Sequence, residues 1–277
     1  VSGVSRHHRG GASRTGARMS LLLPRGLSSR AGAIASIGAS GSAGTSMVNS
    51  ATHTKGAWQQ LIAASARDAC GIVVMIQGKI GFSSAAHLVD IGVGAASSEQ
   101  IIAANLAANT NNWANSTSYY FFPIAIPAGS RIAARSQNSY VGGYEVNVSV
   151  LLLSGDLSTA LGRIETCGAT PASTAGTNID PGASANTKGA WTQIIGATSC
   201  DYKGVVVGFL AQAGNKTADL QWMFDIAVGP AASEQIVVPD VIAACDTDQR
   251  IPGTCCTPFF PVRVPAGSRI AARAACN

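Results

Sequence analysis

Three blocks of sequence occur twice, in the same order, within this chain of 277 residues. They are Thr-Lys-Gly-Ala-Trp at 54–58 and 187–191, Asp-Ile-x-Val-Gly at 90–94 and 225–229 with Ser-Glu-Gln-Ile at 98–101 and 233–236, and Pro-Ala-Gly-Ser-Arg-Ile-Ala-Ala-Arg at 127–135 and 265–273. The offset grows from 133 residues (Lys55 to Lys188) to 138 (Arg135 to Arg273), so the second copy carries short insertions of the kind that loops accept. A repeat of about 130 residues has the size of one domain, and the chain is therefore predicted to be a tandem duplication.

Short apolar segments predict strands in both copies. Gly71 to Ile76 and Gly204 to Leu210 are rich in β-branched residues and have the length of buried strands, and Tyr144 to Val150 alternates polar and apolar residues. Turns at 127–129 and 265–267 are each expected to join two strands, at 121–126 and 131–135 in the first copy and at 259–264 and 269–273 in the second. The pattern predicts an all-β fold of two tandem antiparallel β-sandwiches of jelly-roll or Greek-key type with an extended basic N-terminal arm. Ser98 to Ala108 is the one segment whose pattern could instead be helical.

Composition divides the chain into four parts. Residues 1–50 form a basic, Gly- and Ser-rich arm in which 19–30 could be a strand, 51–156 form the first sandwich, 157–186 a low-complexity linker and 187–277 the second sandwich. Residues 37–51 have the same low-complexity character as the linker. The repeated Trp58 and Trp191 are expected to fill the two sandwich cores.

The second copy ends before one expected strand has appeared. Ser20 to Leu23 resembles the apolar run at 149–153, but the chain stops at Asn277 before a second counterpart of Tyr144 to Leu153. Either a strand is missing from the second sheet and the Ser20 to Leu23 segment, from this chain or a neighbour, fills that edge by strand addition, or the second copy simply ends there.

The net charge of +5 resides in the N-terminal arm. Six arginines and no acid lie within residues 1–54, whereas the rest of the chain holds 13 basic and 14 acidic residues. The arm is either a solvated tail or an anchor for an acidic groove of a partner protein or for nucleic acid. The arginines concerned are Arg6, Arg9, Arg14, Arg18, Arg25 and Arg30.

The residues offer little that could perform chemistry. Hydrophobic residues make up 47% of the chain and charged residues only 12%, and no apolar run reaches the roughly 18 to 20 residues that span a bilayer. The opening residues lack the apolar stretch of a secretory signal. None of the four histidines and none of the seven cysteines is repeated at matching positions, and hydrolase, phosphate-loop and dinucleotide motifs are missing. We therefore expect no membrane segment, no metal or cofactor and no enzymatic activity.

The repeated charged residues are candidates for an interface. Asp90 and Glu99 form an acid pair that both copies contain, and the closing blocks supply arginines four residues apart on one face of a strand. The arginines could pair with the acids, either as exposed surface pairs or as bridges between subunits, whereas a glycosidase-like role for the acids would require a cleft in which they converge. The residues are Asp90, Glu99, Arg131 and Arg135 in the first copy and Asp225, Glu234, Arg269 and Arg273 in the second.

The three repeated blocks resemble a β-sandwich module of virion structural proteins of tailed bacteriophages. The resemblance covers most of residues 54–153 and 187–273 and implies a non-enzymatic, multicopy virion protein on the capsid, neck or tail. Its expected partners are other virion proteins and copies of itself, with nucleic acid only through the arm. Two other hypotheses remain: a receptor- or glycan-binding module with exposed aromatic residues around 109–120 and 216–222, and a hydrolase that uses Asp90 and Glu99.

Overall fold

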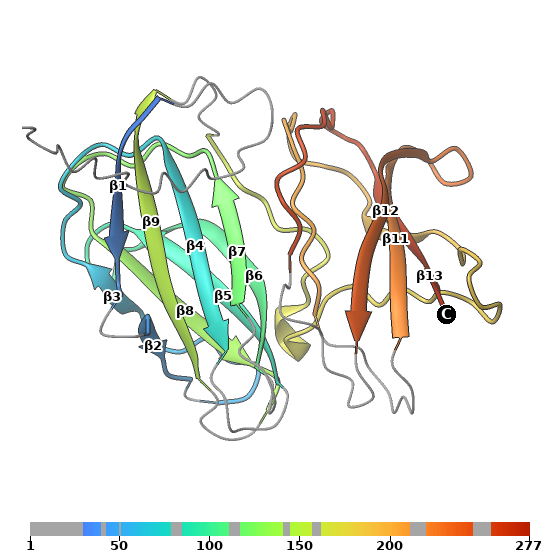
Figure 1. Ribbon diagram of the computed structural model, residues 1–277, viewed down its shortest axis with the longest axis horizontal. Coiled ribbons are helices and arrows are strands. Elements are labelled where there is room, and N and C mark those ends of the chain that lie inside the picture. The colour runs from blue at the N-terminus through green and yellow to red at the C-terminus, as the bar shows by residue number, and fades with distance from the viewer. Residues whose placement is uncertain are drawn as a thin grey trace, which may run out of the picture.

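A computed structural model describes most of the chain, and its regular structure is almost entirely β (Figure 1). In the described residues the one helical element is a 3-10 turn, Pro171–Ser173, so no described helix could cross a membrane. The all-β prediction is confirmed. The described residues are 30–39, 43–49, 51–78, 85–110, 117–140, 145–156, 162–210, 220–245 and 256–277. The segment Ser20 to Leu23 and most of the basic arm lie outside them, including Arg6, Arg9, Arg14, Arg18 and Arg25.

The first copy is a β-sandwich of two antiparallel sheets. One sheet has the order β1 (Arg30–Ile37), β9 (Val146–Asp156), β4 (Gly71–Gly78) and β7 (Thr117–Phe122), with β2 (Thr45–Met47) also paired to β9. The other has the order β3 (Gln59–Ile62), β8 (Ile132–Asn138), β5 (Ala85–Val93) and β6 (Gln100–Thr110). Side chains from both sheets, including Val74, Val150 and Ile91, are fully buried in one shared core.

The second copy rebuilds only one of these sheets completely. Its strands lie in the order β10 (Thr192–Ile195), β13 (Ile270–Cys276), β11 (Leu220–Val228) and β12 (Gln235–Cys245), which matches the order β3-β8-β5-β6 of the first copy. Opposite this sheet, the described residues 202–208 and 256–264 meet only at isolated bridges. The prediction of continuous strands at 204–210 and 259–264 is therefore wrong. The physical reason is that β4 is held on both sides, by β7 and β9, whereas among the described residues its counterpart pairs on one side only.

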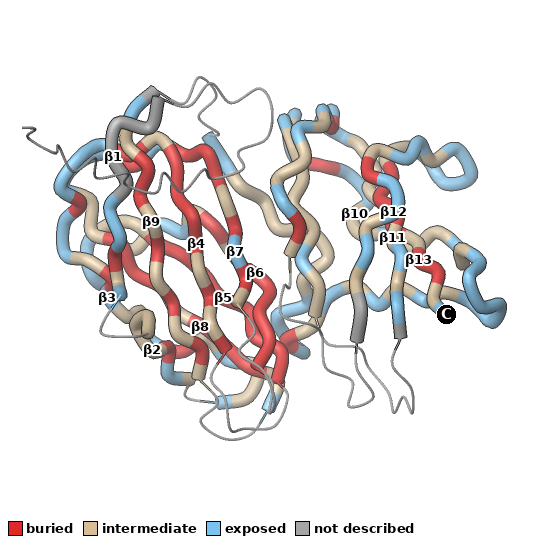
Figure 2. The backbone as a smooth tube through the Cα atoms, in the orientation of Figure 1, coloured by how far each residue is buried: buried red, intermediate tan, exposed pale blue. Residues whose placement is uncertain are grey.

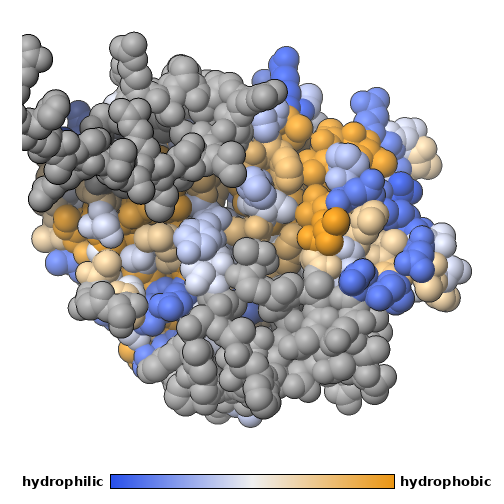
Figure 3. Space-filling view, viewed as in Figure 1, coloured by the Kyte–Doolittle hydropathy of each residue, from blue (hydrophilic) through white to orange (hydrophobic). Residues whose placement is uncertain are grey.

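This difference leaves the second core less buried than the first. Val74 in β4 is 0% exposed, whereas its counterpart Val207 is only half-buried. Figure 2 shows the strands of the first copy largely as buried backbone and those of the second copy mainly as intermediate or exposed. Hydrophobic residues also reach the surface of the second copy in the space-filling view (Figure 3).

The segment that could have been helical is strand β6. A β-bulge interrupts its pairing with β5, and Asn105 within it has a left-handed φ of 54°. The extra residue shifts the inward and outward alternation, so the buried Ala103 and Leu106 are three positions apart, as in a helix. The bulge therefore explains the misleading spacing.

Low-complexity composition did not prevent two segments from packing. Within residues 37–51, Met47 in β2 is 0% exposed and belongs to the first core. Within the linker, Thr174 is 1% exposed, and its hydroxyl lies 2.9 Å from Nδ1 of His53 and donates to the Asn138 carbonyl at 3.1 Å. The structure therefore places both β1–β2 and part of the predicted linker against the first sandwich.

The predicted turns are present in both copies. Gly129 and Gly267 have φ of 78° and 74°, in the left-handed region that glycine adopts without strain. In each turn the following serine N–H donates to the proline carbonyl at 3.3 Å. The turns fix how β8 and β13 begin.

A buried histidine in the first core gives a testable prediction. His87 is 0% exposed, neither ring nitrogen has a hydrogen-bond partner among the described residues, and burial lowers its pKa to about 3. Because the unfolded chain binds a proton near pH 6.5 and the folded chain does not, stability is present above pH 6.5 and is lost as the pH falls toward 3. Replacing His87 with methionine should flatten the decline by up to about 1.4 kcal/mol per pH unit. Urea unfolding between pH 7 and pH 5 checks this, and equal pH slopes for the two proteins would contradict it.

Candidate functional site: two repeated ionic clusters and an apolar cavity

An ionic cluster lies on the outer face of the first copy's β3-β8-β5-β6 sheet. Val89 and Ile91 of β5 point into the core, so the intervening Asp90 points outward, yet it is only 2% exposed. Lys55 Nζ lies 2.6 Å from its Oδ1, and Arg135 Nε on β8 lies 2.9 Å from its Oδ2. The segment that carries Lys55 thus covers the sheet and is held to two of its strands.

The same carboxylate also holds the bulge of β6. The backbone N–H of Asn105, the residue with left-handed φ, donates to Asp90 Oδ1 at 2.9 Å. A buried carboxylate that accepts bonds from two cations and a backbone N–H has its charge and its lone pairs satisfied. Asp90 therefore joins the covering segment, β5, β8 and β6 at one point.

The second copy builds the same cluster from the corresponding atoms. Lys188 Nζ lies 2.8 Å from Asp225 Oδ1, and Arg273 Nε lies 2.9 Å from Asp225 Oδ2. Its Oδ1 also accepts the backbone N–H of Asp240 at 3.0 Å, and Asp240 has a φ of 51°. The bulge in β12 is therefore held as the bulge in β6 is.

Each cluster is covered by a tryptophan rather than by core residues. The guanidinium carbon of Arg135 lies 4.5 Å from the ring centroid of Trp58, and Arg273 stands over Trp191 at the same distance. Both tryptophans are only half-buried, so the prediction that they fill the cores is wrong. Trp58 instead packs on the outer face against Gly92, where an added Cβ would lie 2.8 Å from the indole ring. Cation–π contact explains this position in both copies.

A second ion pair lies near the β5–β6 hairpin of the first copy and near the β11–β12 hairpin of the second. Arg131 Nη1 lies 2.7 Å from Glu99 Oε1, and Arg269 Nη1 lies 2.8 Å from Glu234 Oε1. Each arginine also donates through Nε to a repeated glutamine side chain, Gln60 in the first copy at 2.9 Å. The guanidinium group thus bridges the hairpin to the edge strand.

The fields of these partners stabilise the charged forms of the acids. Burial alone would raise the pKa of Asp225, but hydrogen bonds from Lys188, the Asp240 N–H and Arg273 outweigh it and hold this pKa below its usual value. Burial likewise opposes the charge on Glu99 and Glu234, and backbone N–H groups together with the paired arginine lower both pKa values. Asp225, Glu99 and Glu234 are therefore carboxylates at neutral pH.

The expected pairing of arginines with acids is confirmed, and it occurs within each copy. Asp90 and Glu99 are held by different basic partners, and each carboxylate is already engaged in bonds within its own copy. In the described part of the chain, no group of three or more His, Cys, Asp or Glu side chains is arranged to hold a metal ion. A contact of these side chains with another subunit remains a prediction.

Sequence reasoning missed two repeated partners. Lys55 and Lys188 stand in the first repeated block, where a lysine kept in both copies was the available signal. Asp68 and Asp201 also repeat at the 133-residue offset, outside the blocks, and each accepts the backbone N–H of the turn alanine, at 2.7 and 2.8 Å. Applying the offset to every acid would have found this pair.

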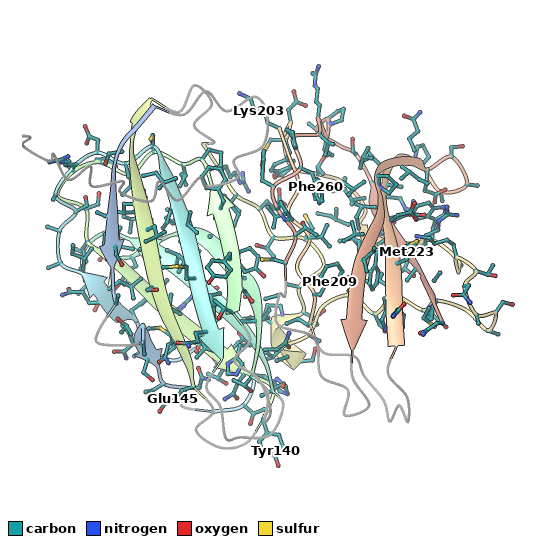
Figure 4. All side chains as sticks on the ribbon, in the orientation of Figure 1. Tyr140, Glu145, Lys203, Phe209, Met223 and Phe260 are labelled. Atoms are coloured by element: carbon teal, nitrogen blue, oxygen red, sulfur yellow. The ribbon has the colours of Figure 1, made fainter. Side chains whose placement is uncertain are left out.

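A cavity of about 1150 Å³ lies in the second copy and at its boundary with the first. Its walls include core-facing side chains of β11 and β13, such as Phe224, Ile226 and Ala272, together with residues 203–210. Figure 4 places Phe209 and Phe260 between the first copy and strands β11 and β12. The volume exceeds the roughly 300–1000 Å³ of pockets that hold small ligands. The cavity lies where the first copy has core side chains.

The aromatic residues expected at a glycan site are distributed differently. Tyr119 on β7 is 55% exposed, whereas Trp222 lines the cavity. Residues 111–116 of the first predicted region and 216–219 of the second lie outside the described residues. The described aromatic side chains therefore form no repeated exposed platform.

No protein-family profile and no curated protein matches this chain. A search of solved structures finds similarity to the crystal structure of PBSX exported protein XepA. The two chains are 10% identical, the match covers 89% of this chain and 87% of that chain, and the TM-score is 0.23. A TM-score this low does not establish a shared fold.

Replacing the central acid gives a prediction with a matched control. Asp90→Asn should lower the free energy of unfolding by about 3 kcal/mol, because it leaves Lys55 and Arg135 without a counter-charge. Asp68→Asn changes another repeated aspartate with an exposed backbone contact and should cost only about 1 kcal/mol. Urea unfolding of both variants at pH 7 measures the difference, and equal losses would show that the cluster adds nothing beyond one hydrogen bond.

Proposed function

We propose that the chain is a structural component of a tailed-phage virion, present in many copies, that docks on and decorates or joins capsid, neck or tail proteins. Its repeated blocks at 54–58, 90–101 and 127–135 resemble a module of such proteins. The sandwich architecture of the first copy agrees with that resemblance. In this proposal the chain is not an enzyme.

One observation carries the proposal: the residues that both copies share are used to hold each copy together. In the first copy, Asp90 binds both Lys55 and Arg135. In the second copy, Asp225 binds Lys188 and Arg273 in the same way. A structural protein that contains two copies of a module requires the stabilising ion pairs in both copies. A single catalytic centre would not require a second intact copy. The shared chemistry is therefore architectural.

The partners in this proposal are other virion proteins and further copies of the chain. The low fraction of charged residues, 12%, suits a surface that neighbours cover. All of the charged residues in the arm are arginines. In this proposal the arm lies in an acidic groove of a neighbouring protein or against nucleic acid.

The proposal predicts that the chain sediments with purified particles of the phage that encodes it. Mass spectrometry of the particles should find several copies per virion, and gold-labelled antibody should mark one region of the particle. If the arm anchors the protein, washing with 1 M salt should release it, because the Debye length falls from about 10 Å at 0.1 M to about 3 Å at 1 M.

A variant with the arm arginines at positions 6, 9, 14 and 18 changed to glutamine is the matched control and should be released at lower salt. Recovery of the chain only in the soluble fraction of the lysate would contradict the virion assignment. Retention of both proteins at 1 M salt would contradict the electrostatic anchor alone. Label at an exposed particle tip together with specific binding on a glycan array would favour the receptor-binding alternative.

A further inference from the structure

We propose that residues 17–24 of one chain add a strand to the second copy of another chain, in the position that β9 occupies in the first copy. This position is called the acceptor slot below and is bounded by residues 162–168 and 203–210. Both of these segments line the cavity of about 1150 Å³. This strand addition does not depend on the proposed virion function, and it can be tested on the isolated protein.

The first copy shows what belongs in the slot. There β9 lies between two strands, pairing with β1 along one edge and with β4 along the other. Its side chains Val148 and Val150 are 0% exposed and help to form the core. The core of the first copy is thus completed by a strand that follows it in sequence.

The strands β1 and β4, which pair with β9 along its two edges, both have counterparts in the second copy. Gly38 after β1 and Gly168 both have left-handed φ, 75° and 76°. Each carbonyl accepts a threonine hydroxyl, Thr45 at 3.0 Å and Thr177 at 3.2 Å. Gly168 therefore ends a segment equivalent to β1, yet residues 162–168 belong to no β-ladder. In the described part of the chain no strand pairs with this segment.

The other wall of the slot is an open strand edge. Val205 exchanges both of its backbone hydrogen bonds with Phe260, at 2.9 and 2.8 Å. Adjacent residues of a strand direct their N–H and C=O groups to opposite sides, so Gly204 and Val206 face the slot. In the described structure no hydrogen bond joins the backbone of either residue to another residue. Such an edge favours pairing with a further strand.

The N-terminal arm contains a sequence with the pattern of β9. Residues 17–23 read Ala-Arg-Met-Ser-Leu-Leu-Leu and residues 146–152 read Val-Asn-Val-Ser-Val-Leu-Leu. In β9 the core-facing positions are every second residue, and each is at most 3% exposed. Four apolar residues of the arm align with these core-facing positions. Ala17, Met19, Leu21 and Leu23 match, in this order, Val146, Val148, Val150 and Leu152.

The register of β9 predicts the contacts of the arm. Because Val74 pairs with Val150 and Ile72 with Leu152, Leu21 should lie opposite Val207 and Leu23 opposite Val205. Pro24 then falls opposite Gly204 at the end of the slot. A proline lacks the N–H needed to continue a ladder, so the added strand would end there.

The occupant comes from a second chain because of where the arm begins. Arg30 starts β1, the edge strand farthest from β7 in its sheet, whereas the second copy lies beside β7, where Cys256 Sγ donates to the Tyr119 carbonyl at 2.9 Å (Figure 1). Residues 24 and 30 are six residues apart in sequence, so their Cα atoms lie at most about 22 Å from each other. The three strand spacings from β1 to β7 take about 14 Å of this length. The slot lies beyond β7, in the second copy, so little length remains for a connection within one chain. A neighbouring chain has no such restriction.

Disulfide trapping between two full-length chains tests the proposal. Leu22 should lie opposite Val206, as Leu151 lies opposite Val73, at a separation that a disulfide can bridge. One chain carries Leu22→Cys, the other Val206→Cys, and the two are mixed under mild oxidation. Mass spectrometry of the linked peptides should find a bond between positions 22 and 206, which distinguishes it from bonds of the native thiols.

Substitutions in the arm provide the second readout. Leu21→Asn with Leu23→Asn should weaken self-association, followed by sedimentation velocity, by at least about tenfold for each leucine, because burying one leucine changes an equilibrium constant by that much. Leu22→Asn is the matched control and should leave association unchanged, since its counterpart Leu151 points away from the core. Both variants leave every described residue of the two copies unchanged.

Three results would overturn the proposal. The first is a 22–206 bond that forms only when both cysteines are in one chain, which would mean that the arm fills its own slot. The second is the lack of any 22–206 bond together with a monomeric wild-type protein. The third is equal association of the Leu21→Asn/Leu23→Asn and Leu22→Asn variants.

Discussion

The buried carboxylate of Asp90, repeated as Asp225, is the interaction on which each copy depends. It ties the segment before β3 to β5 and β8 and also holds the bulge of β6. Taking an aspartate out of water is costly unless its charge is paired and its lone pairs accept hydrogen bonds. Two cations and one backbone N–H meet this requirement in both copies. Ionic contacts therefore hold the covering segment to the outer face of the sheet.

This arrangement explains which parts of the site could be predicted from the sequence. The acids and the arginines were visible because both copies keep them at matched positions, and their pairing followed from charge. The positions of Trp58 and Trp191 could not be predicted in the same way, because an aromatic residue next to a strand normally enters the core. Here the ring of Trp58 lies over Arg135, which is far away in sequence.

The fold shows the same division between local and distant information. β4 and β9 were predicted because their apolar and alternating patterns are local properties. β6 was ambiguous because one bulged residue, Asn105, changes the phase of the pattern. The segment at 204–210 has nearly the same local pattern as β4, but its state depends on whether a neighbouring strand is present, which no local window contains. The composition of residues 157–186 predicted a linker, but Thr174 in this segment is buried. Its partners, Gln137 and Asn138, are distant in sequence.

The proposed filling of the acceptor slot by a neighbouring arm has a consequence for how an assembly of these chains can end. A chain that gives one strand and takes one strand makes a heterologous contact, which either closes into a ring or continues as an open array. However many chains join, an open array keeps one empty slot at one extremity and one unused arm at the other. Only ring closure, or a different protein that caps each extremity, leaves no slot and no arm unpaired.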